Sequence, residues 1–142
     1  MLCGLFSFRF GKAEKARVAE ASASTGQPER LKSPPASFPE GRFNQALGVW
    51  EVQWPEVRER QGLRYIDVRE LAELRALPMV ERGEHVPLGE LNARAEAWPR
   101  GAALVVICRS GGRSGRAVLA LEAMGFTNVV SLAGGMLGVA RP

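Results

Sequence analysis

Cysteine, histidine and lysine are scarce in this chain of 142 residues, which contains two cysteines, one histidine and three lysines. The two cysteines, Cys3 and Cys108, cannot form a disulfide framework. We interpret Cys3 as an incidental residue and Cys108 as a reduced thiol in a reducing compartment. No motif in the sequence implies a metal ion or a cofactor.

Long hydrophobic runs are also missing. No apolar stretch approaches the roughly 18–20 residues that a helix needs to cross a bilayer, so we expect no transmembrane segment. The short apolar stretch at residues 2–10 precedes its positive charges, whereas an export signal has them first. We therefore expect a cytoplasmic protein with a frayed start. A short helix touching a membrane surface and an organellar transit peptide stay open as alternatives for this segment.

Positive charge is in excess only in the first third of the chain. The net charge is +4, but residues 1–46 carry 7 basic and 4 acidic groups while residues 47–142 carry 12 and 11. Lys12, Lys15 and Lys32 all precede residue 47, and no basic stripe is interleaved with aromatic residues. The remainder is nearly neutral, which argues against nucleic-acid binding.

Composition divides the chain near residue 46. Serine, alanine, glycine and proline dominate residues 19–41, where four prolines interrupt any helix (Pro28, Pro34, Pro35 and Pro39). Such a segment buries too little apolar surface to offset the entropy of ordering it. We predict a flexible basic tail over residues 1–46 and one folded domain over residues 47–142.

Strand and helix patterns alternate through this domain. The sequence predicts strands at residues 50–54 (an edge strand), 63–68, 84–87, 102–108 and 128–132. It predicts helices at residues 55–60, 70–77, 88–98 and 113–124, and a short one after Gly134 and Gly135. This alternation indicates an α/β fold, a small and mostly parallel sheet with helices on both faces. Ligands bind beyond the carboxyl ends of strands in such folds, and Cys108 ends the most apolar strand.

The segment from Cys108 to Ser114 combines several features that stabilise an anion on sulfur. Gly111 and Gly112 permit a tight curl of the backbone, and the next helix begins with its positive dipole end. Arg109 and Arg113 add positive charge, and no acidic residue lies between positions 100 and 116. We therefore predict a nucleophilic Cys108 whose pKa lies within the range of about 3.5–7.5 found for activated cysteines.

Two simpler interpretations of this segment are weaker. A cysteine at the end of an apolar strand is often only a small buried hydrophobe, but burial requires neither the glycines nor the arginines. A glycine-rich turn can also hold a nucleotide phosphate, but the G-x-x-x-x-G-K-[ST] spacing and its lysine are missing.

The string CRSGGRS at residues 108–114 closely resembles the active-site loop of single-domain rhodaneses, the thiosulfate sulfurtransferase-like family. Further resemblances follow in the family's order: YIDVRE at residues 65–70, HVPL at 85–88, GFTNV at 125–129 and LAGGM at 132–136. Two departures concern substrate choice. The segment from His85 to Leu88 is shorter than in the family, and Gly138-Val139 stands where the family has an alanine and a tryptophan.

The resemblance implies a small α/β sheet and a sulfurtransferase without a cofactor. Cys108 would take sulfur from a small anionic donor such as thiosulfate and pass it, as a persulfide, to a thiol or to cyanide. The backbone N–H groups of residues 109–114 would hold the outer sulfur. Arg109 and Arg113 would attract the donor, and Ser110 and Ser114 would add hydroxyl donors.

The resemblance gives structural roles to the other matched residues. Asp67 and Arg69 would brace the end of a strand, with Glu73 as a partner for Arg69, and His85 would lie in a connecting segment. Two functions remain as alternatives to the enzyme. One is a dedicated persulfide relay to a partner protein. The other is a cysteine phosphatase or arsenate reductase, which is disfavoured because the sixth position after Cys108 is Ser114 rather than an arginine.

Overall fold

The computed structural model describes residues 33–140, and its folded unit begins at Pro34. One six-stranded sheet has the order β1-β2-β6-β5-β3-β4. All neighbouring strands are parallel except β1, which runs antiparallel to β2. The strands are β1 (Arg42–Asn44), β2 (Val49–Val52), β3 (Arg64–Asp67), β4 (Gly83–His85), β5 (Leu104–Ile107) and β6 (Val129–Leu132).

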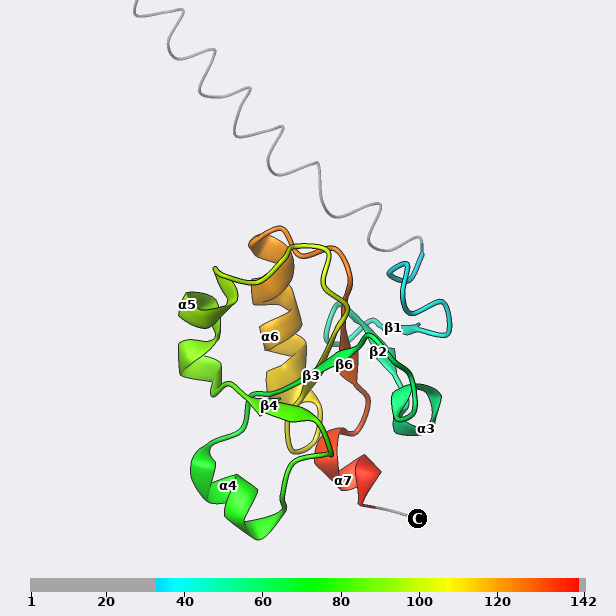
Figure 1. The fold of residues 1–142 in the computed structure, drawn as a ribbon. Helices are drawn as coiled ribbons and strands as arrows, with labels where there is room; N and C mark the ends of the chain where they lie inside the picture. Colours follow the sequence, from blue (N-terminus) through cyan, green and yellow to red (C-terminus); the bar gives the residue numbers. More distant parts are fainter. Residues whose placement is uncertain (1–32, 141–142) are drawn as a thin grey trace, which may run out of the picture. The chain divides into compact units, whose positions relative to one another are not determined.

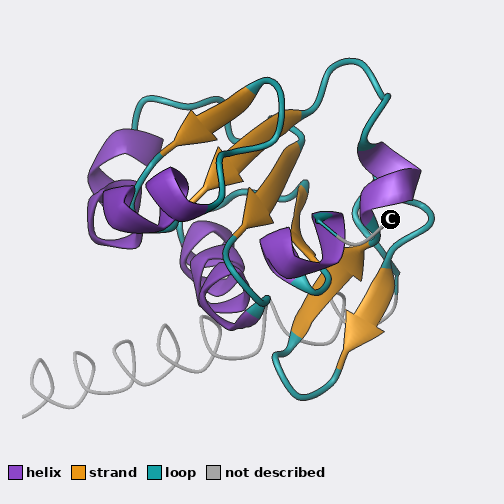
Figure 2. Cartoon of the chain, turned by 90° about the horizontal axis from the view of Figure 1, so that it is seen from below, coloured by secondary structure: helices purple, strands orange, loops and turns teal. Residues whose placement is uncertain are grey.

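Helices lie on both faces of this sheet, so the predicted fold class is confirmed (Figures 1 and 2). They are α3 (Trp54–Val57), α4 (Leu71–Ala76), the 3-10 helix η1 (Leu88–Glu90), α5 (Leu91–Ala95), α6 (Gly112–Ala123) and α7 (Gly135–Val139). Within residues 33–140, no helix has both the length and the apolar character needed to cross a membrane.

The apolar strand β5 supplies both cores of the domain because successive side chains point to opposite faces. Leu104 and Val106 pack in the core beneath α5 and α6, and Val105 and Ile107 pack in the core on the side of α3 and α7. Cys108 continues the first of these series, so its side chain faces α6. The pattern read as a central strand therefore also fixes the direction of the thiol.

The folded unit begins earlier than the predicted boundary at residue 47. Phe38 is fully buried in the core on the side of α3 and α7, and the Ser37 N–H donates to Asn128 Oδ1 at 3.0 Å. Residues 42–44 form β1, which covers β2, so the strand expected at the edge of the sheet is internal. The prediction of a flexible tail over residues 1–46 is thus wrong for residues 34–46, and its remainder lies almost wholly outside the described residues.

The parallel strands bring their carboxyl ends to a single edge. Asp67 closes β3, Cys108 follows β5, and Gly134 and Gly135 follow β6. Helix α4 begins four residues after Asp67 and lies at this same edge, at the lower end of Figure 1. This edge contains the predicted chemistry.

Candidate active site

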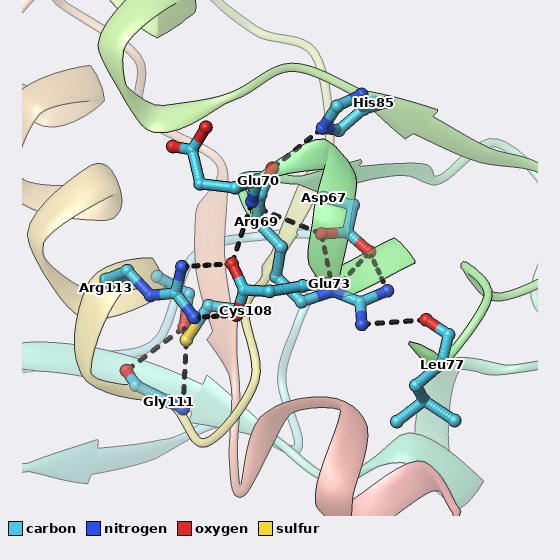
Figure 3. A network of polar contacts seen from close by, with 10 residues as sticks. Asp67, Arg69, Glu70, Glu73, Leu77, His85, Cys108, Gly111 and Arg113 are labelled. Atoms are coloured by element: carbon cyan, nitrogen blue, oxygen red, sulfur yellow. Dashed lines mark hydrogen bonds and ion pairs between the residues drawn. The ribbon is translucent and has the colours of Figure 1, made fainter. Parts of the chain in front are cut away.

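Cys108 lies at the floor of the loop that joins β5 to α6. Its Sγ accepts a hydrogen bond from the Gly111 N–H at 3.0 Å, which requires the chain to curl back on itself (Figure 3). Gly111 has a φ of +112°, a conformation that residues with a side chain rarely adopt. Cys108 is 1% exposed, so a reactant must approach the sulfur with a narrow end.

The first turn of α7 is hydrogen-bonded to the backbone of this loop. The Met136 N–H donates to the Cys108 carbonyl oxygen at 2.8 Å, and the Leu137 N–H donates to the Arg109 carbonyl oxygen at 3.0 Å. Gly135 packs directly against these two carbonyl groups. Gly112, which the sequence suggested was needed for the curl, is instead the first residue of α6, has no positive φ and has free space around it.

Two buried serines lie beside the sulfur. Ser114 Oγ is 3.4 Å from Cys108 Sγ, 3.1 Å from the Gly111 carbonyl oxygen and 2.7 Å from Ser131 Oγ. The Gly111 carbonyl also accepts from the Gly115 N–H, so it stays paired when the Ser114 hydroxyl turns to the sulfur. Ser131 can donate to Ser114 throughout and leave the Ser114 proton for a thiolate.

The pKa of Cys108 is lowered, in the predicted direction. Burial raises this pKa and is the largest single influence, but several hydrogen bonds together outweigh it. They come from the Ser114 hydroxyl and from the backbone N–H groups of Ser114, Gly111 and Ser110. The thiolate is therefore stabilised by the loop's own donors, as a curled loop at a strand end predicts.

Replacing Ser114 with alanine should raise the pKa of Cys108, because it removes a hydrogen bond that lowers this pKa. A hydrogen bond to a charged group contributes about 1.5–3 kcal/mol, so its loss should be large enough to measure. The alkylation rate measured against pH would then have its midpoint at higher pH than in the wild type. Ser110→Ala is the control because Ser110 is exposed and contributes through its backbone. Equal midpoints in Ser114→Ala and wild type would contradict the assignment.

Arg113 is not free to act as the open positive charge that the sequence suggested. Its two terminal nitrogens donate to the two carboxylate oxygens of Glu73 at 2.7 and 2.6 Å (Figure 3). Glu73 comes from α4, forty residues earlier in the chain, so counting charges along the loop could not reveal it. The expected pairing of Glu73 with Arg69 is wrong, because Glu73 forms its ion pair with Arg113.

Arg69 instead pairs with Asp67, and both side chains are only 1% exposed. The guanidinium donates to both carboxylate oxygens of Asp67 and, at 2.8 Å, to the Leu77 carbonyl oxygen. His85 Nε2 lies 2.7 Å from the Arg69 carbonyl oxygen, which can only accept, so this nitrogen carries the proton. The contacts of Asp67, Arg69 and His85 thus tie the ends of β3, β4 and α4 together.

The loop residues therefore separate into two groups. Cys108, Gly111 and Ser114 meet around the sulfur. Arg109 and Ser110 are exposed, and within the described part of the chain their side chains make no hydrogen bond or ion pair. Ser131 was missed by the sequence reasoning. The available signal was its alternation with Val129, which places a polar residue on the α6 face of an apolar strand.

Comparison with known proteins finds similar sequences and similar folds. The putative sulfur carrier protein YrkF of Bacillus subtilis (strain 168) is 34% identical over 83 residues, which are 57% of this chain and 43% of that protein. A rhodanese-related protein from Thermoplasma volcanium is 26% identical with a TM-score of 0.56, over 65% of this chain and 94% of that one.

The human single-domain sulfurtransferase TSTD1 has a TM-score of 0.58 over 65% of this chain and 96% of its own. At 22% identity it shows the shared fold alone. The matches cover less than half the length of the two curated relatives. The family model described as a rhodanese-like domain matches residues 55–141, more than half of the sequence. The chain therefore belongs to the rhodanese-like domain family.

Proposed function

We propose that this protein is a sulfurtransferase in which Cys108 carries the transferred sulfur as a persulfide. The observation that carries the proposal is the position of Cys108 Sγ. It lies at the carboxyl end of the central strand β5, it accepts the Gly111 N–H at 3.0 Å, and its pKa is lowered. A thiolate in a ring of N–H donors suits sulfur exchange, because the thiolate is the reactive form of cysteine.

The reaction would consist of two displacements at sulfur. The Cys108 thiolate attacks the outer sulfur of thiosulfate, the S–S bond of the donor breaks, and sulfite leaves with the electron pair. An acceptor thiolate or cyanide then attacks the outer sulfur of the Cys108 persulfide, and Cys108 leaves as the thiolate. Neither step consumes an external oxidant or reductant, so the cycle needs no cofactor.

The residues around Cys108 would have separate roles. The N–H groups of residues 109–114 would hold the negative outer sulfur of the persulfide, and the Ser114 hydroxyl would stabilise the Cys108 thiolate. Arg109, which is exposed, would attract an anionic donor. The 1% exposure of Cys108 favours donors that present a terminal sulfur atom, since a bulky disulfide cannot reach it. A persistent free thiol also fits the cytoplasm, our expected location.

Intact mass after incubation with thiosulfate tests the proposal. The wild type should gain the mass of one sulfur atom, and added cyanide should remove it. Cys108→Ser should gain nothing, whereas Cys3→Ser, the matched control at the chain's other cysteine, should behave as the wild type. A sulfur adduct that persists in Cys108→Ser would show that the assignment is wrong.

A dedicated persulfide relay is the second candidate, because Arg113 is engaged by Glu73 and one relative is named a putative sulfur carrier protein. Negligible turnover of small donors, together with rapid charging of Cys108 by a persulfide-bearing protein, would favour the relay. A phosphatase would need a free guanidinium in this loop to bind the phosphate group of its substrate. Here Arg113 is paired with Glu73 and Ser114 is buried, so the loop gives no support to a phosphatase.

A further inference from the structure

The ion pair between Glu73 and Arg113 adjoins the reactive sulfur. Arg113 immediately precedes Ser114 in the first turn of α6, and Ser114 Oγ is 3.4 Å from Cys108 Sγ. Figure 3 shows the Arg113 guanidinium bound to the Glu73 carboxylate beside Cys108, whose charge acts on Arg113. Each partner keeps just over a quarter of its side chain exposed, so the pair meets solvent and any arriving substrate.

The Glu73 carboxylate is ionised at every pH at which the protein would work. The hydrogen bonds from Arg113, and next from the Glu70 N–H, lower its pKa to about 2. Besides its own two members, the pair interacts with the Cys108 thiolate, which acts on Arg113, and with Arg69, which acts on Glu73. Glu73 thus neutralises the positive charge that Arg113 would otherwise present to a donor. Glu70 adds a more distant carboxylate that also acts on Arg113.

We propose that Glu73 is a specificity-determining residue, which makes the Cys108 site favour sulfur donors with one negative charge or none over dianions such as thiosulfate. This inference rests on the proposed sulfurtransferase function. The donors that Glu73 would select are hydropersulfides, R–S–SH, and singly charged thiosulfonates. For a hydropersulfide, Cys108 attacks the outer sulfur, R–S⁻ leaves with the electron pair, and the proton stays on the sulfur now attached to Cys108.

The charge of the donor decides how strongly Glu73 acts. The interaction of a donor with one carboxylate is proportional to the charge of the donor, so a dianion is penalised twice as much in free energy as a monoanion. Removing the carboxylate should therefore speed a dianion about tenfold and a monoanion about threefold at low ionic strength. Added salt should shrink both effects, because the pair is partly exposed.

Thiosulfate and methanethiosulfonate make a matched pair of donors. Both transfer a terminal sulfur from a sulfonyl group, and they differ by one negative charge. The measurement is the second-order rate constant of Cys108 persulfide formation with each donor, for the wild type and Glu73→Gln. We expect the ratio of the thiosulfate constant to the methanethiosulfonate constant to rise about threefold in Glu73→Gln.

Glu84→Gln is the matched control. Glu84 also forms a two-bonded pair with an arginine, but that partner is Arg64, at the amino end of β3 and so opposite the site. The ratio should not change in this variant. An unchanged ratio in Glu73→Gln, with both donors still reacting, would overturn the inference and leave the sulfurtransferase intact. A wild type that forms no persulfide with either donor would overturn the proposed function itself.

The double variant Glu73→Gln/Arg113→Met separates charge balance from direct binding. It removes one negative and one positive charge, so we expect a donor ratio near that of the wild type. Arg113→Met alone should lower the ratio about threefold, because Glu73 is then unopposed. If Arg113 bound the donor directly, the double variant would be as poor with thiosulfate as Arg113→Met, and this result would also overturn the inference.

Discussion

Replacing Gly135 with alanine should lower the free energy of unfolding by about 2–4 kcal/mol. Gly135 has a φ of +56°, where a residue with a side chain is strained by roughly 1–2 kcal/mol. A methyl group there would lie 2.6 Å from the carbonyl carbon and oxygen of Arg109, and it would also meet the Cys108 carbonyl oxygen. These are backbone atoms that cannot turn aside, and overpacking of this kind costs about 1–3 kcal/mol.

Urea unfolding of Gly135→Ala and of the control Gly112→Ala measures the loss of stability at two glycines of the same site. Gly112 has no positive φ, and a methyl group there would meet nothing within 4 Å. Its replacement should therefore change stability by no more than about 0.5 kcal/mol. Similar urea midpoints for the two variants would show that α7 does not hold the cysteine loop as described.

Replacing Arg69 with methionine should destabilise the fold by about 3–5 kcal/mol. The change leaves the Asp67 carboxylate in a site that is 1% exposed, with one remaining hydrogen bond from the residue 69 N–H. An uncompensated buried charge is far more costly than the intact pair is stabilising. The Leu77 carbonyl also loses its donor, so the end of α4 should loosen as well.

Arg64→Met is the matched control, because Arg64 also forms a two-bonded pair with a carboxylate. Arg64 and Glu84 are 31% and 41% exposed, and the guanidinium lies 4.6 Å from the Trp98 ring centroid. Losing both contacts should cost about 1 kcal/mol. Denaturant unfolding of both variants gives the difference. Equal losses would mean that the Asp67–Arg69 pair is not shielded from water.

The segment around Cys108 was predictable because local pattern and tertiary structure agree there. The continuous apolar run at residues 104–107 became the central strand, and the glycine-rich turn began the longest helix of the described residues. Most other elements appeared within a few residues of their predicted places. The family resemblance is confirmed by the match over residues 55–141.

The features that could not be predicted all depend on residues distant in sequence. Phe38 stands among prolines and serines that resemble a linker, and only the core on the side of α3 and α7 reveals its role. Glu73 reaches Arg113 across forty residues, so the charge near the sulfur could not be counted along the loop. Ser131 is a single polar residue in an apolar strand, and only the fold brings Ser114 to 2.7 Å from it.

The strand order also determines when the contacts that hold the cysteine loop can form. The last strand of the sheet, β6, lies between β2 and β5, so Val52 pairs with Leu132 across most of the domain. Such long-range pairing forms late, because distant parts of the chain must first meet. A chain that ends before residue 129 lacks Ser131, which lies 2.7 Å from Ser114, and the Met136 N–H, which donates to the Cys108 carbonyl oxygen. The contacts that hold the cysteine loop in place are thus completed only when residues 129–137 have joined the fold.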